Sequence, residues 1–74
     1  MENKMVINKN SKNIKVAGHV GRWDVIDVGT CKGKEAFLLE HTTYGEDAGM
    51  LIVDSAGKVL EEDVFDGFPL EEWN

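Results

Sequence analysis

Residues 36–54, which read AFLLEHTTYGEDAGMLIVD, decide the fold of this chain. Two apolar runs, residues 36–39 and 50–53, flank a polar loop. Each run is too short for a helix and lacks the alternation of a half-exposed strand, which predicts two strands buried on both faces. The loop between them is too short for a parallel crossover, so we expect an antiparallel pair at the centre of a sheet.

Further strands are predicted on both sides of this pair. Residues 5–7 and 14–17 are short β-prone segments separated by asparagine and serine, which predicts a first hairpin. Residues 22–28 predict a third strand, in which Trp23 is the largest candidate for the core. Residues 54–58 begin with aspartate and carry a glycine near their end, which indicates a short turn into another antiparallel strand.

The C-terminal segment predicts a helix. Pro69 suits a first helical turn, and Glu71 and Glu72 complement the helix dipole. The apolar residues of this segment would cover one face of the sheet: Phe65, Phe68, Leu70 and Trp73. Docking of the same tail into a groove of a partner is the alternative. The expected fold class is therefore α+β: an antiparallel meander sheet of roughly five to six strands with a short C-terminal helical segment packed on one face.

Length and composition indicate a single domain over residues 1–74, with residues 1–13 as a first hairpin and residues 64–74 as a C-terminal tail or helix. The single cysteine, Cys31, excludes an internal disulfide and fits a reducing compartment. No stretch has the apolar length of a signal peptide or a membrane span, so we expect a cytoplasmic protein without membrane contact. Because the tail can cover one face only, we expect the other face to meet a second copy of the chain, as a homodimer, or a partner protein.

Acidic residues are concentrated in the second half of the chain. Residues 1–39 carry seven Lys/Arg and four Asp/Glu, a net charge of +3, whereas residues 40–74 carry one lysine and ten acids, a net charge of −9. Such a field repels nucleic acid and attracts basic protein surfaces. Solubility is the alternative role of these acids. The lysines of the first 15 residues lack interleaved aromatics, so we expect no direct nucleic-acid binding.

No pattern of catalytic, metal or cofactor residues is evident. Residues 29–34 (GTCKGK) differ from a phosphate-binding loop, because three residues separate the glycines and Glu35 stands where a hydroxyl is required. We predict a hairpin turn there instead. Cys31 lacks an evident base, and the histidines, His19 and His41, have no second ligand at a metal-binding spacing. We therefore expect no enzyme, no catalytic or metal-binding residue and no cofactor.

Partner-binding residues are expected in two places. Tyr44, Glu46 and Asp47 occupy the polar loop between the two buried strands, where binding residues commonly lie. Ordering of that loop is the alternative role for them. The second place is the acidic run of the last strand and the tail, formed by Glu61, Glu62, Asp63 and Asp66. The expected partner is a protein with a basic surface.

Part of the chain resembles a known family. Four segments carry the resemblance: GRWDVID (21–27), FLLEHTTYGEDA (37–48), LIVD (51–54) and DVFDGF (63–68). Together they resemble a small β-rich domain of large polyvalent proteins, which are carried by phages and conjugative elements of Gram-positive gut bacteria. The resemblance covers residues 18–68 and leaves the lysine-rich first 15 residues outside. It implies an accessory protein of a mobile genetic element and carries over no catalytic residue.

The leading functional hypothesis is a small acidic, non-enzymatic binding protein of a mobile genetic element. In this hypothesis it is a counter-defence inhibitor, of the anti-CRISPR or anti-restriction type, that occludes a basic nucleic-acid-binding surface of its partner. The net charge of −6 is sparse beside a duplex with one charge per ~1.7 Å, which favours local occlusion over duplex mimicry. The alternative is a structural or regulatory module of DNA-processing machinery. A small hydrolase that uses Cys31, His41 or the acids is the third hypothesis.

Overall fold

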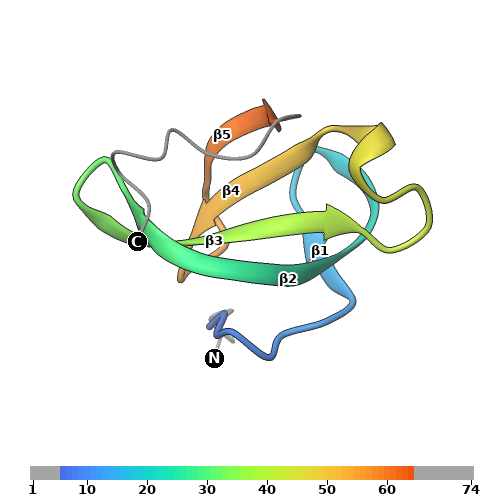
Figure 1. The fold of residues 1–74 in the computed structure, drawn as a ribbon. Helices are drawn as coiled ribbons and strands as arrows, with labels where there is room; N and C mark the ends of the chain where they lie inside the picture. Colours follow the sequence, from blue (N-terminus) through green and yellow to red (C-terminus); the bar gives the residue numbers. More distant parts are fainter. Residues whose placement is uncertain (1–5, 65–74) are drawn as a thin grey trace.

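The computed structural model describes residues 6–64, and these residues form one five-stranded antiparallel sheet (Figure 1). Consecutive strands are neighbours, in the order β1-β2-β3-β4-β5. Within this part of the chain one short 3₁₀ turn, η1, precedes β4. The elements are β1 (Ile14–Val16), β2 (His19–Cys31), β3 (Lys34–His41), η1 (Glu46–Ala48), β4 (Met50–Asp54) and β5 (Val59–Val64).

The expected α+β class is wrong. The described residues are all-β, with η1 as their only helical turn, and no helix packs on the sheet within residues 6–64. The physical reason is that the chain covers one face of its central strands without a helix, because Ile7, Ile14 and Val16 join that face. The expected helix at Pro69 and the apolar residues of the tail lie outside the described residues. The meander order and the number of strands agree with the prediction.

The first hairpin also differs from the expectation. β1 pairs with β2, and residues 6 and 7 do not form a strand. A local turn explains the difference: the Ser11 amide donates to the Asn8 carbonyl at 3.0 Å, and the Asn8 amide donates to the Ser11 hydroxyl at 3.0 Å. The chain before this turn instead meets the turn between β4 and β5, where the Ile7 amide donates to the Ser55 carbonyl at 2.8 Å.

β3 and β4 form the antiparallel pair that the sequence predicts, and β3 is the central strand. Residues 36–39 and 50–53 are all buried, so both faces of the pair are covered, as expected. Alternate side chains enter different clusters. Phe37, Leu39, Leu51 and Val53 pack with Ile7, Ile14, Val16, Trp23 and Val25 in the first cluster, whereas Ala36, Leu38, Met50 and Ile52 pack with Cys31 in the second.

The predicted turns before and after the central pair are confirmed. Lys32 (φ 54°) and Gly33 (φ 80°) both have positive φ, as a two-residue type I′ turn requires, and they join β2 to β3. Asp54 closes the turn into β5, because its Oδ1 accepts the amide protons of Ala56 at 3.0 Å and Lys58 at 2.9 Å. This carboxylate therefore has a structural role.

The sheet bends enough to bring β2 close to β5, although two strands separate them in the sheet. The pairing of β2 with β3 shifts register between Val25 and Asp27, and the pairing of β4 with β5 shifts as well. Bulges of this kind bend a strand and increase its twist. As a result, Nε2 of His19, at the start of β2, lies 3.5 Å from Oε1 of Glu62 on β5.

Burial on both faces predicts that the fold loses stability when either cluster is trimmed. Leu39→Ala and Ile52→Ala each truncate a side chain with 0% exposure, and each should lower the free energy of unfolding by about 2–5 kcal/mol. Ile26→Ala, at a side chain that is 47% exposed, is the control and should change it by less than about 0.5 kcal/mol. Urea denaturation followed by tryptophan fluorescence measures all three. A cost below about 1 kcal/mol for Ile52→Ala would contradict burial of the second cluster.

Candidate partner-binding site

The loop residues predicted to bind a partner lie at one end of the central pair. Tyr44 follows the end of β3, and the acids Glu46 and Asp47 form the start of η1. The pairing of Met50 with Val64 places the end of β5 beside the strand that follows η1. Acids from two separate parts of the sequence, Glu46 and Asp47 in η1 and Asp63 near the end of β5, therefore lie at the same end of the sheet.

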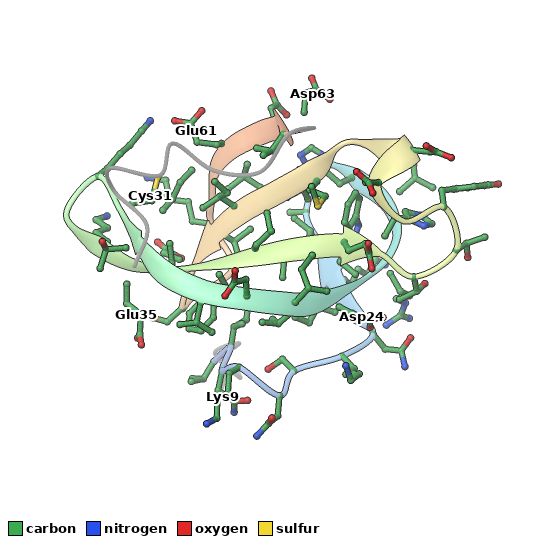
Figure 2. The ribbon with its side chains drawn as sticks, viewed as in Figure 1. Lys9, Asp24, Cys31, Glu35, Glu61 and Asp63 are labelled. Carbon is green, nitrogen blue, oxygen red and sulfur yellow. The ribbon has the colours of Figure 1, made fainter. Side chains whose placement is uncertain are left out.

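The acids of β5 lie along one side of the molecule. Glu62 and Asp63 are exposed, and Glu61 is half-buried. Figure 2 shows Glu61 and Asp63 on the β5 side, well away from Glu35 near the β2–β3 turn. Asp66, the remaining acid predicted to bind, lies outside the described residues.

Beside these acids is a hollow of about 280 Å³, which we call the aromatic pocket. Its apolar rim is unusually open to solvent, because Val20 is 91% exposed and Tyr44 is 66% exposed. Sequence reasoning identified one of its residues, Tyr44, as a binding residue, and it assigned Trp23 to the core. The residues that line the aromatic pocket are His19, Val20, Trp23, His41, Tyr44 and Ala48.

The rings of the aromatic pocket form a continuous row. His19 and Trp23 meet edge to face, with ring centroids 6.3 Å apart, and Trp23 and His41 do the same at 5.0 Å. His41 and Tyr44 are tilted by 35° at a centroid separation of 5.0 Å. The register of β2 and β3 creates this row, since Trp23 lies directly opposite His41. Such contacts add about 0.5–1.5 kcal/mol each beyond the area they bury.

His41 is held in one orientation by the backbone of the loop. Its Nδ1 accepts the amide protons of Thr43 at 3.0 Å and of Tyr44 at 3.2 Å. A nitrogen that accepts two hydrogen bonds carries no proton, so the neutral ring carries its proton on Nε2. His41 is 8% exposed and therefore serves first to shape the loop and the wall of the aromatic pocket.

Gly21 allows the imidazole of His41 to approach the backbone of β2. Its φ is +95°, and a Cβ built on it would overlap Nε2 of His41. Only glycine meets both conditions without strain. No sequence signal distinguishes Gly21 from the neighbouring turn glycine, Gly18, around which a Cβ would meet no atom within 4 Å.

Trp23 adds a polar group to the wall of the aromatic pocket. The side chain is 3% exposed, and among the described residues its Nε1 is a buried nitrogen without a hydrogen-bond partner. A buried donor that is left unsatisfied costs about 1–3 kcal/mol. Packing of the indole between two histidine rings offsets that cost.

The acids near the pocket are not equally available to a partner. The Asp24 Oδ1 accepts the Asn13 amide proton at 2.9 Å, which ties the N-terminal segment to β2. Glu61 forms an ion pair with Lys32, with 2.9 Å between Oε2 and Nζ. The exposed acids nearest the β3–β4 loop and the end of β5 are Glu46, Asp47, Glu62 and Asp63.

A second hollow, of about 590 Å³, adjoins the aromatic pocket and shares His19 with it. Its walls are Ala17 and His19 on one side and residues 57–62 on the other. This wall carries Lys58 as well as Glu61 and Glu62, and of the two acids it is Glu62 that lies beside His19, at the junction with the aromatic pocket.

The candidate catalytic residues do not come together. Cys31 lies opposite Lys34 at the turn between β2 and β3, whereas His41 lies at the far end of β3. Cys31 is buried in the second apolar cluster. Over residues 6–64, no group of three or more His, Cys, Asp or Glu side chains is arranged to hold a metal ion. In the same part of the chain, no helix has the length and hydropathy needed to cross a membrane.

Comparison with known proteins identifies one family. A family model described as large polyvalent protein-associated domain 18 matches residues 3–73. The match includes the lysine-rich N-terminal segment that the resemblance in the sequence had left outside. No curated protein and no solved structure matches the chain.

The close approach of Gly21 to His41 predicts a specific difference between two glycine substitutions. In Gly18→Ala the added Cβ meets no neighbouring atom, but the residue keeps a positive φ that alanine disfavours, so the free energy of unfolding should fall by about 1–2 kcal/mol. Gly21→Ala should cost at least about 1 kcal/mol more, because it also displaces the His41 ring. Urea denaturation gives the costs, and NMR shifts of the Thr43 and Tyr44 amides report the displacement. Equal costs, with unshifted amides in Gly21→Ala, would contradict the contact.

Proposed function

The chain belongs to the large polyvalent protein-associated domain 18 family, and on that premise we propose that it is a non-enzymatic accessory domain that binds a protein partner with a basic surface. The binding site is the acidic end of the sheet, formed by the β3–β4 loop with η1, the end of β5 and the aromatic pocket between β2 and β3.

The observation that supports this proposal best is that exposed acids and exposed apolar side chains lie at the same end of the sheet. The register that pairs Met50 with Val64 brings Asp63 toward the loop that carries Glu46 and Asp47. Solubility alone does not require acids to lie beside an open apolar pocket. Protein-binding surfaces commonly have a polar rim around apolar anchors, and charges at the rim speed the encounter with a partner of opposite charge.

The partner that fits this site is a nucleic-acid-binding protein, because its basic surface is complementary to the acids. The domain would occlude part of that surface and would not replace a whole duplex, since several acids serve the fold or pair with lysine. More specifically, we propose that the chain is a counter-defence inhibitor of the anti-CRISPR or anti-restriction type. It would be encoded by a phage or a conjugative element and act in the cytoplasm.

Recruitment through the sheet edge, as a structural or regulatory module, has less support. The edge strands of the described sheet are β1, which has three residues, and β5, which carries Glu61, Glu62 and Asp63 and has shifted register with β4. Lys32 Nζ also donates to the Leu60 carbonyl at 3.4 Å. Charged residues and bulges of this kind prevent an edge from pairing with another strand. The hydrolase hypothesis lacks geometric support, because Cys31 and His41 lie at opposite ends of β3.

The test of the proposed function is a capture experiment with matched baits. The tagged chain, Glu46→Gln, Asp63→Asn and the control Glu35→Gln are each exposed to a bacterial lysate at about 0.05 M salt and eluted toward about 0.5 M. Glu46→Gln and Glu35→Gln change the net charge equally at exposed sites in different parts of the fold.

We expect a basic nucleic-acid-binding protein to elute from the unmodified bait and from Glu35→Gln as the salt rises. Its recovery should fall about threefold or more from Glu46→Gln and Asp63→Asn, because a charge that faces the partner has been removed. Equal recovery from all four baits, or capture of acidic proteins only, would overturn the proposal.

A further inference from the structure

The aromatic pocket combines features that plain solubility does not require. Val20 and Tyr44 expose apolar surface at its rim, where an isolated domain would gain by burying it. Its volume of about 280 Å³ lies near the lower end of the sizes usual for small-molecule sites and is ample for a single side chain of a partner.

We propose that the aromatic pocket takes one arginine side chain from the basic partner. This inference rests on the proposed function and adds the residue type that anchors the complex. A guanidinium is planar and stacks on aromatic faces, and it is less strongly hydrated than an ammonium group, so it loses less on entering such a pocket. Tyr44 offers an exposed ring for this contact, and the His41 ring lies beside it.

Carboxylates beside the pocket favour a cation over a neutral side chain. Glu62, with its side chain 62% exposed, lies 3.5 Å from the His19 ring that lines the pocket. Glu46 and Asp47 directly precede Ala48, which also lines the pocket. A cation over an aromatic ring with carboxylates nearby gains from both the ring quadrupole and the charges.

The walls of the pocket are already formed before a partner arrives. Two backbone amides orient the His41 ring, and the absence of a side chain at Gly21 gives that ring its place. Trp23 and His41 are buried, so Tyr44, which is largely exposed, is the ring whose side chain would have to be ordered on binding. A preformed site lowers the entropy cost of binding, which makes selection of one side chain practicable.

A second copy of the chain is a weaker occupant. Arg22 is the chain's single arginine, and its Nη1 already donates to the Asn13 carbonyl at 3.3 Å. The other basic residues of the chain are lysines, which stack on aromatic rings less well than arginine. The observations therefore favour an arginine from a different protein.

The test compares hexa-arginine and hexa-lysine peptides, which carry equal charge, in NMR titrations of the folded chain. The signals followed are the Tyr44 amide and the Trp23 indole N–H. The variants are Tyr44→Ala, which removes the exposed ring, Tyr44→Phe, which keeps it, and Ile26→Ala, which removes exposed apolar surface outside the pocket.

We expect both peptides to bind with salt-dependent affinity and hexa-arginine to bind about threefold to tenfold more tightly. Tyr44→Ala should abolish this preference and leave hexa-lysine binding unchanged, whereas Tyr44→Phe and Ile26→Ala should retain it. Equal affinities for the two peptides, with no effect of Tyr44→Ala, would overturn the arginine anchor and leave the proposed function standing. Failure of both peptides to bind would overturn the proposed function as well.

Self-association is distinguished in the same samples. If the Tyr44 and Trp23 signals broaden with protein concentration in the absence of peptide, and sedimentation gives the mass of two chains, a second copy occupies the pocket. That outcome would overturn the arginine proposal.

Discussion

The structure depends on one constraint: β3 and β4 are adjacent and apolar on both faces, so both faces of the pair must be covered. Alternate side chains divide these strands between two clusters. On the first face, the cover comes from Ile7, Ile14 and Val16, which reach it because the N-terminal segment turns at Asn8 and the sheet bends. The bulges in β2 and β5 make that bend possible.

The same bend produces the candidate site. It brings the start of β2 to β5, so that His19 contacts Glu62 and belongs to both hollows. At the same end of the β2–β3 pairing, Trp23 faces His41, and the loop that follows wraps over the imidazole through two amide hydrogen bonds. The pocket is therefore a product of strand register and loop closure, and its residues come from separate parts of the chain.

The chemistry of this site suits recognition. The histidine with the most defined surroundings, His41, uses one nitrogen to order its own loop and is packed between aromatic rings. The acids at the rim are exposed, so they can form hydrogen bonds or ion pairs with a partner without rearrangement of the core. In the proposed complex, the exposed charge around this small aromatic hollow would set the rate and the specificity of association, and the apolar contact would supply affinity.

The sequence by itself determined the central antiparallel pair, the turns at Gly33 and Asp54 and the meander order, because these follow from local apolar runs and from turn residues whose conformations are intrinsic. It also identified Tyr44, Glu46 and Asp47 as loop residues. Only the tertiary structure decided that the described chain is all-β, that residues 6–7 leave the first hairpin, and that His19, Trp23 and His41 meet Tyr44 in a pocket. These features depend on sheet curvature and strand register, which arise from packing between residues distant in the chain and leave no local pattern to read.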